Sequence, residues 1–235
     1  MIYVMSDIHG NLERFNSVMS QINLQPEDTL YILGDVVDRF PDGIRILRRL
    51  MLMPNVKMLI GNHEYMMLNA LSEPIDNMSS IAVDYDYNMA LWYGNGGYVT
   101  HRYLKRINKT LRKEIFDYLL SLPLNYDIDV NGMKYKLAHA APIDLYDEFG
   151  RGYRDEREFT VWYRFHSCEE LPDDYTLVYG HTPTLYVQDV DPTEIWYGQN
   201  RICIDCGAGY DSDLRCHTRL ACLRLDDYKE FYSNT

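Results

Sequence analysis

The sequence predicts an α/β fold in which a parallel sheet connected by helices packs against a second sheet. Two observations support this prediction. The first third of the chain holds three short apolar segments, each followed by a polar loop and a helix-like pattern, at residues 2–5, 29–33 and 56–60. The second half is rich in strand-like segments. Strands that alternate with helices form parallel sheets, whose sites lie at the carboxyl ends of the strands.

Helices are expected after each of the first three strands. In residues 11–22 the apolar side chains recur at helical spacing, and Asn11 is a residue type that commonly caps a helix N-terminus. Residues 43–53 and about 65–71 have the same character. Residues 73–118 are less regular and rich in tyrosine and asparagine, and we expect helices there that cover the edge of the site.

A hairpin is predicted in the second half, where Asn131-Gly132 separates strand-like residues 126–130 from 134–138. This dipeptide favours the tight turn of a two-residue hairpin loop. Further strands are expected at residues 176–179, 201–204 and 220–225. Because no repeat, linker or low-complexity tract divides the sequence, we expect one domain over residues 1–235.

Length, cysteine content and charge limit the class of protein. A chain of 235 residues can bury a large core without disulfides. Five cysteines are an odd number, which argues against a secreted disulfide framework and for a reducing compartment. We see no signal peptide, and no apolar run near the roughly 20 residues of a membrane span. We expect a cytoplasmic protein without a membrane partner. A net charge of -12 without a basic stripe argues against nucleic-acid polymers as partners.

Five polar clusters carry the chemistry, and each follows a predicted strand. They are Asp7-x-His9, Gly34-Asp35-x-x-Asp38-Arg39, Gly61-Asn62-His63-Glu64, His139 and Gly180-His181. A side chain at the end of a buried strand is held by rigid backbone and points into a shared crevice. The set offers oxygen and nitrogen ligands without thiolate, which suits Mn²⁺, Fe or Zn²⁺. Since a carboxylate can bridge two ions, the set is large enough for two metals.

Taken singly, each cluster has an ordinary structural explanation. Asp7-x-His9 alone would be a turn, and a lone His139 or His181 would be a hydrogen-bonded core histidine. All of these explanations would have to hold at once, so the shared position after strands favours a site. Cys203-x-x-Cys206 together with Cys216 and Cys222 also suggests a zinc site. Because Cys203 and Cys222 each lie in a predicted strand, we prefer to interpret them as small buried hydrophobes.

The order of these clusters resembles that of the bacterial and phage-type serine/threonine phosphatases, the phosphoprotein phosphatase family of the calcineurin-like metallophosphoesterases. The resemblance extends from Met5 to about Leu225. It includes three further segments, Trp92 to Gly97, Gly180-His181-Thr182-Pro183 and Ile204-Asp205-Cys206-Gly207. It implies a sandwich of two mixed β-sheets flanked by helices, in α/β/β/α layers, and a metal-dependent phosphoester hydrolase.

The resemblance also implies a role for each site residue. The implied metal ligands are Asp7 and His9 for the first ion, Asp35 as the bridge, and Asn62, His139 and His181 for the second. The implied catalytic residues are His63 as general acid, Asp38 as its orienting partner and Arg39 as a ligand of the phosphoryl oxygens. A second arginine usually assists in this family. The candidates are Arg151, Arg154, Arg157 and Arg164, and we choose Arg164 because Trp162-Tyr163-Arg164 resembles the family's Trp-x-Arg element.

The chemistry of phosphoryl transfer agrees with this set. Negative charge spreads over the equatorial oxygens, so the site needs cations there. Two divalent metals, which we expect to be Mn²⁺ with Fe or Zn²⁺ as alternatives, lower the pKa of a bridging water enough to give hydroxide near neutral pH. That hydroxide attacks phosphorus directly and in line. A protonated histidine that is oriented by a carboxylate can then donate a proton to the departing oxygen.

The expected substrate is a phosphorylated serine or threonine in a protein, or a small phosphoester. The alternative is a nucleotide phosphoester or anhydride such as diadenosine tetraphosphate, because related enzymes share the same core. A second alternative is an inactive metal-binding scaffold, against which the presence of His63, Asp38 and Arg39 argues.

Three positions depart from the family pattern. Phe40 stands where glycine usually follows Asp-Arg, Ala140-Ala141 replaces Gly-Gly, and Ser6 replaces a common glycine before Asp7. None is expected to touch a proposed ligand, so the departures concern substrate fit more than metal binding.

Overall fold

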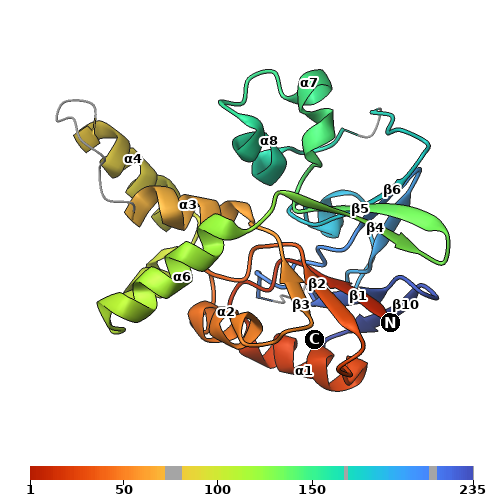
Figure 1. Cartoon of the computed structure of the whole chain (residues 1–235), viewed down its shortest axis with the longest axis horizontal. Coiled ribbons are helices and arrows are strands. Elements are labelled where there is room, and N and C mark those ends of the chain that lie inside the picture. The colour runs from red at the N-terminus through yellow and green to blue at the C-terminus, as the bar shows by residue number, and fades with distance from the viewer. Residues whose placement is uncertain (72–80, 167–168, 212–215, 235) are drawn as a thin grey trace.

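A computed structural model gives the structure of the chain and describes residues 1–71, 81–166, 169–211 and 216–234. Within these residues, two five-stranded sheets lie face to face, and helices flank them on both outer sides (Figure 1). This arrangement confirms the predicted α/β sandwich of two mixed sheets.

The first sheet has the strand order β10-β9-β1-β2-β3. Strands β1 (Ile2–Met5), β2 (Thr29–Ile32) and β3 (Val56–Met58) are parallel, as predicted. Strand β9 (Ala221–Arg224) runs antiparallel to β1, and β10 (Lys229–Tyr232) runs antiparallel to β9. Strand β10 was not predicted, because two of its four residues are charged.

The second sheet has the strand order β4-β5-β6-β8-β7. Its first two strands form the predicted hairpin, whose turn residues Asn131 and Gly132 both have positive φ (55° and 81°). The three central strands are parallel to one another, so their carboxyl ends lie at the same edge. The strands are β4 (Asn125–Val130), β5 (Met133–Ala138), β6 (Thr176–Tyr179), β7 (Trp196–Gly198) and β8 (Arg201–Cys203).

Helices cover both sheets and one side of the site. The helices are α1 (Leu12–Ile22), α2 (Gly43–Met51), α3 (Asn62–Leu71), α4 (Ile81–Gly94), α5 (Tyr98–Leu104), α6 (Lys109–Ser121), α7 (Tyr146–Phe149) and α8 (Glu156–Trp162). The expectation of helices within residues 73–118 is confirmed for α4, α5 and α6, and residues 72–80 lie outside the described residues. Helix α8 was not predicted. No helix in the described parts of the chain has both the length and the apolar character of a membrane span.

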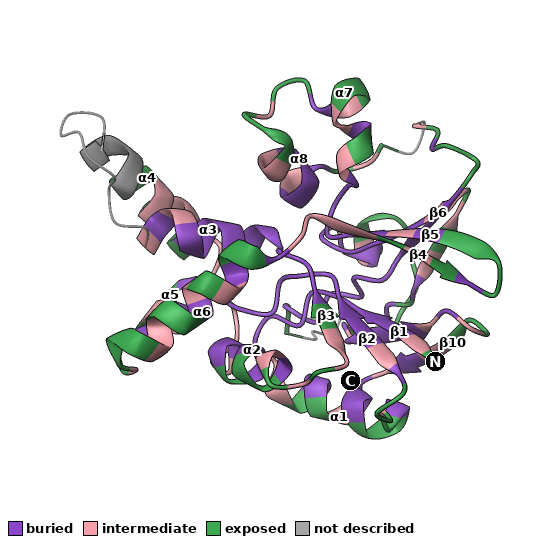
Figure 2. Cartoon of the chain, in the orientation of Figure 1, coloured by how far each residue is buried: buried purple, intermediate pink, exposed green. Residues whose placement is uncertain are grey.

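The pleat of β2 divides its side chains between two cores. Leu30 and Ile32 belong to the cluster packed under the helices, whereas Tyr31 and the following Leu33 belong to the cluster between the two sheets. All four are buried, and buried backbone surrounds the carboxyl end of the strand (Figure 2). Alternate side chains on opposite faces are the rule for a strand. A strand anchored on both faces holds the residues that follow it in fixed positions.

The substitution Ile32→Ala should lower the free energy of unfolding by roughly 2–5 kcal/mol, because it leaves a cavity in a packed core. The control is Leu52→Ala, since Leu52 is 85% exposed and should change stability little. Urea unfolding measures both variants. Equal effects would contradict the assignment of Ile32 to the core.

Candidate active site

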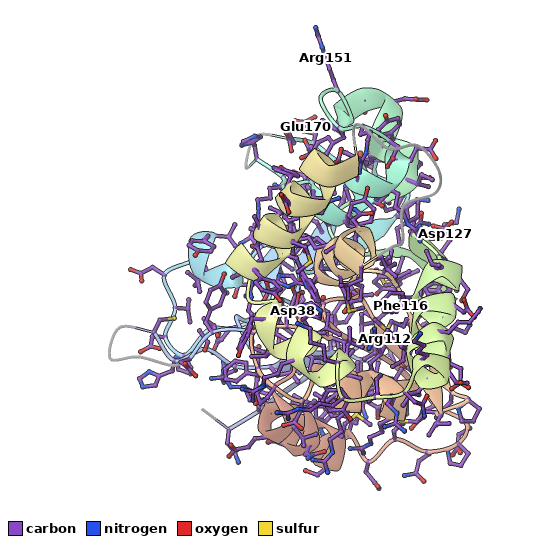
Figure 3. All side chains as sticks on the ribbon, turned by 90° about the vertical axis from the view of Figure 1, so that its left-hand side faces the viewer. Asp38, Arg112, Phe116, Asp127, Arg151 and Glu170 are labelled. Carbon is purple, nitrogen blue, oxygen red and sulfur yellow. The ribbon has the colours of Figure 1, made fainter. Side chains whose placement is uncertain are left out.

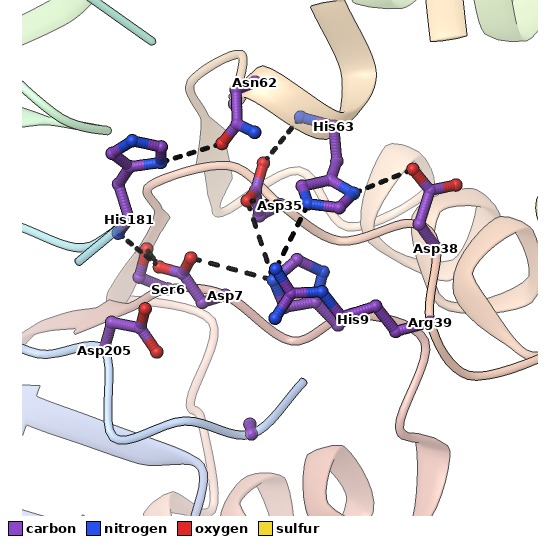
Figure 4. A network of polar contacts seen from close by, with 12 residues as sticks. Ser6, Asp7, His9, Asp35, Asp38, Arg39, Asn62, His63, His181 and Asp205 are labelled. Carbon is purple, nitrogen blue, oxygen red and sulfur yellow. Dashed lines mark hydrogen bonds and ion pairs between the residues drawn. The ribbon is translucent and has the colours of Figure 1, made fainter. Parts of the chain in front are cut away.

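The predicted ligand residues meet in one buried region although they come from distant parts of the sequence (Figure 4). Each lies just after a strand, or in the first turn of the helix that follows it. Every one of them is at most 5% exposed: Asp7, His9, Asp35, Asn62, His139 and His181. The start of α3 is a correction, since this helix begins at Asn62 rather than near residue 65.

The loops that carry these residues have an uncommon backbone conformation. Six non-glycine residues have positive φ between 49° and 72°: Asp7, His9, Asp35, Asp38, Arg39 and His181. This left-handed region is sparsely populated by residues with a side chain, and such residues gather at functional sites. The backbone here is therefore shaped by where the side chains must point rather than by local stability.

Asp7 is held through one of its two oxygens. Its Oδ2 accepts hydrogen bonds from the Ser6 hydroxyl (2.5 Å) and from the backbone N–H of His181 (3.0 Å). Its Oδ1 faces His9 Nε2 at 3.8 Å. The expectation that Ser6 leaves the proposed ligands untouched was wrong. A glycine here would leave the N–H of His181 to hold Asp7 Oδ2, and the Ser6 hydroxyl adds a second donor to the same oxygen.

His9 presents a lone pair to two carboxylates. Its Nδ1 lies 3.2 Å from the carbonyl oxygen of Val37, which can only accept, so Nδ1 carries the proton. Burial lowers the pKa of His9 well below its ordinary value, so the ring is neutral. Its Nε2 then lies 3.8 Å from Asp7 Oδ1 and 3.6 Å from Asp35 Oδ2 without a proton to share.

A second group of acceptors has the same character. His139 donates from Nδ1 to the carbonyl of Leu33 (2.7 Å), and burial lowers its pKa, so Nε2 is a lone pair. That nitrogen lies 2.9 Å from Asn62 Oδ1 and 3.6 Å from Asp35 Oδ1. His181 Nδ1 also lies 2.9 Å from Asn62 Oδ1, and burial lowers the pKa of His181 as well.

These acceptor groups fit divalent cations. Lone pairs that face one another in a buried pocket repel unless positive charge lies among them. Asp35 lies between the two groups, with Oδ2 toward His9 and Oδ1 toward His139. Burial, together with the nearby carboxylate of Asp7, raises the pKa of Asp35. Imidazoles that ligate a metal usually donate their other N–H to a carbonyl, as His9 and His139 do here. Two groups that could hold an ion share Asp35: His9, Asp35 and His63, and Asp35, His139 and His181.

His63 lies within reach of the first group but differs in protonation. Its Nδ1 lies 2.8 Å from Asp38 Oδ2, and its Nε2 lies 3.4 Å from the Arg39 guanidinium. Burial alone would lower the pKa of His63, but the carboxylates of Asp35 and Asp38 outweigh it and raise the pKa. The Asp38 carboxylate engages Nδ1, and the raised pKa favours the protonated form of the ring. His63 is therefore better suited to donate a proton than to bind a metal.

The segment from α4 to α5 supports Asp38 and Arg39. The indole of Trp92 is fully buried and donates to Asp38 Oδ2 (2.8 Å), the same oxygen that His63 faces. The N–H of Asp38 donates to the Thr100 hydroxyl (2.9 Å), and the N–H of Arg39 donates to the Gly96 carbonyl (3.2 Å). The sequence had indicated Trp92 to Gly97 as a family segment but gave no sign of this contact.

The loop after β8 covers Arg39 from the other side. The Tyr210 ring lies 4.6 Å from the Arg39 guanidinium, a distance at which a ring face attracts a cation. Gly209 packs so closely on His9 and Arg39 that any side chain there would overlap them. The backbone of this loop is fastened to α1 by Arg14, which donates to the carbonyls of Ala208 and Tyr210 (3.1 Å each). Sequence reasoning missed Tyr210.

The four arginine candidates lie in different places. Arg164 donates to the His181 carbonyl (3.1 Å) and to the Thr182 hydroxyl (2.9 Å), so its guanidinium is beside the site. Arg154 donates to the Tyr65 hydroxyl. Arg151 extends into solvent away from the body of the protein (Figure 3). The fourth candidate, Arg157, lies in α8. The position of Arg164 agrees with its selection, and its role stays a prediction.

Glu64 was noted in the sequence only as part of a motif, yet it organises the loop that carries Asp35. It is fully buried, and its two oxygens accept hydrogen bonds from four backbone N–H groups at 2.9–3.2 Å. The donors belong to Asp35, Val36, Val37 and Gly61. No sequence pattern separates this carboxylate from a solvated one at a helix start.

The cysteines do not join the candidate metal groups of the described residues. Cys203, Cys206 and Cys222 are buried, and burial raises the pKa of each thiol. They are therefore protonated core residues, as expected. Cys168 lies outside the described residues.

Comparison with known proteins identifies the family. The model of the calcineurin-like phosphoesterases matches residues 1–214, so this chain belongs to that family, whose members use divalent metals. It is 28% identical to serine/threonine-protein phosphatase 2 of Salmonella typhimurium, over 88% of this chain and 87% of that protein. It is 38% identical to the symmetrical bis(5'-nucleosyl)-tetraphosphatase of Pectobacterium atrosepticum, over only 28% of this chain and 24% of that protein.

The fold has the same relatives. The crystal structure of a metallophosphoesterase from Sphaerobacter thermophilus matches with a TM-score of 0.54 and 18% identity, over 100% of this chain and 87% of that one. The family resemblance drawn from the motifs is confirmed, and the chain is a hydrolase of the metallophosphoesterase class.

The substitution Glu64→Gln should lower the free energy of unfolding by about 1.5–3 kcal/mol, because an amide N–H₂ would face backbone donors that now bond a carboxylate. Chemical denaturation measures the change. The control, Glu114→Gln, replaces an exposed residue of α6 and should change stability by less than about 0.5 kcal/mol. Equal values for the two variants would contradict the role assigned to Glu64.

Proposed function

We propose that this chain is a metal-dependent phosphomonoester hydrolase that acts on phosphoserine and phosphothreonine in proteins. The observation that carries the chemistry is the pair of buried acceptor groups on either side of Asp35, next to the His63–Asp38 pair and Arg39. The substrate is supported by alignment length. The Salmonella relative named a serine/threonine phosphatase aligns over 88% of the chain, and the tetraphosphatase over 28%.

The metal ligands would be those that the motifs imply. Asp7, His9 and Asp35 would hold one cation, and Asp35, Asn62, His139 and His181 would hold the other. A carboxylate, amide and imidazole set suits Mn²⁺, with Fe or Zn²⁺ as alternatives. When bound, two such cations would neutralise charge on the phosphoryl oxygens and lower the pKa of a bound water.

The remaining site residues would donate a proton to the leaving group and bind the phosphoryl oxygens. His63 would donate a proton from Nε2 to the departing alkoxide, with Asp38 fixing the ring through Nδ1. Arg39, which contacts His63 at 3.4 Å, would bind phosphoryl oxygens, and Arg164 beside the His181 loop would assist it.

The proposal also includes the domain organisation, the cellular location and the partner of the chain. One domain over residues 1–235 is supported by a core cluster that contains residues of both sheets, such as Val4 and Val178. A cytoplasmic location is supported by buried, protonated cysteines. The partner would be a phosphorylated protein rather than a nucleic-acid polymer or a membrane.

A second candidate is hydrolysis of a dinucleoside polyphosphate, which the short tetraphosphatase alignment favours. Steady-state kinetics on a phosphopeptide, diadenosine tetraphosphate and an aryl phosphate separate the two. The proposal expects the highest kcat/KM on the phosphopeptide, and a preference for the dinucleotide by orders of magnitude would overturn it. Chelation should abolish turnover and Mn²⁺ should restore it, whereas an inactive scaffold would show no turnover under any condition.

The substitution Asp35→Asn should remove at least one of the two metals, because the proposed bridge loses its charge. Elemental analysis after gel filtration measures the content, with Asp117→Asn, 58% exposed on α6, as the control. Two metals retained per chain in the Asp35 variant would rule out the bridging role.

The substitution His63→Asn should keep the metals but reduce kcat on an alkyl phosphate by about 10²–10⁴-fold, since the departing alkoxide then receives no proton. The loss should be smaller on an aryl phosphate, whose leaving group is stable without one. His217→Asn, an exposed histidine, is the control. Equal losses on both substrates would contradict the general-acid role.

A further inference from the structure

Asp205 occupies a ligand position that the motifs did not assign. Strands β6 and β8 are parallel, and Tyr179 pairs with Cys203 at their ends. His181 lies two residues after Tyr179, and Asp205 lies two residues after Cys203. Asp205 therefore stands at the end of β8 where His181 stands at the end of β6.

The side chain of Asp205 lies beside the first acceptor group. It is 3% exposed, and its carboxylate is drawn next to that of Asp7 (Figure 4). Asp7, Arg39 and Asp35 are among the charged groups that act on it most strongly. Among the charged groups around this buried acid, the carboxylate of Asp7 acts on it most strongly.

A structural role does not require an acid at this position. Asp205 Oδ1 accepts one hydrogen bond, from the N–H of Gly207 at 2.9 Å. An asparagine would accept the same bond without bringing a third negative charge into a pocket that already holds Asp7 and Asp35. An uncompensated buried charge is expensive. The three carboxylates of Asp7, Asp35 and Asp205 outnumber the two cationic side chains beside them, Arg39 and His63, so further cationic charge fits this side of the site.

We propose that Asp205 is an additional carboxylate of the metal centre and strengthens binding of the cation held by Asp7 and His9. This inference rests on the proposed metal centre. It makes the first position rich in carboxylate oxygen, with Asp7, Asp35 and Asp205 around one imidazole. The second position has two imidazoles and an amide. Oxygen-rich sites suit harder ions, so the first position favours Mn²⁺ over Zn²⁺ more than the second does.

The test is calorimetric titration of the chelator-treated chain with Mn²⁺. The wild-type chain is expected to bind two ions. In Asp205→Asn one affinity should fall by about 10–100-fold and the other should stay unchanged, as for loss of a supporting group at a metal site. Asparagine keeps the acceptor for Gly207, and circular dichroism checks the fold. Asp205→Ser is a second variant with the same expected direction.

Asp28→Asn is the matched control. Asp28 is 6% exposed and accepts hydrogen bonds from the N–H of Gln25 and from the N-terminal ammonium of Met1, both at 2.9 Å. It precedes β2 and so lies at the opposite end of the strand from the site. Its two Mn²⁺ affinities should equal those of the wild type. Two unchanged affinities in the Asp205 variants would overturn the inference while leaving the proposed function intact. A wild-type chain that binds no Mn²⁺ would overturn both.

Discussion

Electron-rich atoms gather on buried side chains at the carboxyl ends of the strands, and the rest of the fold serves to bring them together. Carboxylate oxygens, an amide oxygen and imidazole lone pairs face one another within 2.9–3.8 Å around Asp35. Without positive charge such a pocket opposes folding. The convergence of these side chains explains why the loops after the strands accept a left-handed backbone at so many residues.

Side chains from other parts of the chain hold this pocket in place. Glu64 collects the backbone N–H groups of the Asp35 loop, Trp92 fixes the Asp38 carboxylate, and Arg14 fastens the loop that covers Arg39. Ser6 restrains Asp7. These contacts use polar groups that are buried and paired, and they hold Asp7 and the loop of Asp35 in place without help from a cation. Preorganisation of this kind is what a metal site needs for tight binding.

Much of the fold and of the site could be predicted because the signals are local. Each apolar segment predicts a strand, and the polar residue that follows it, Asp7, Asp35 or Asn62, is recognised as a candidate ligand by its position. The supporting contacts could not be predicted, since Trp92 lies 54 positions after Asp38 in the sequence and meets it only in the folded chain. Nothing in the sequence distinguishes Glu64 or Asp205 from a solvated acid. Strand β10 was missed because two of its four residues are charged, and helix α8, with seven residues, is too short for a clear periodicity. The substrate could not be predicted from the fold or from the site, because the core chemistry is common to the whole family.

The central claim is that the residues around Asp35 bind two cations. Anomalous X-ray scattering from crystals grown with Mn²⁺ tests it most directly. Two peaks roughly 3.5–4 Å apart are expected, one on each side of the Asp35 carboxylate. No peak beside Asp35, or one peak at a separate surface, would contradict it.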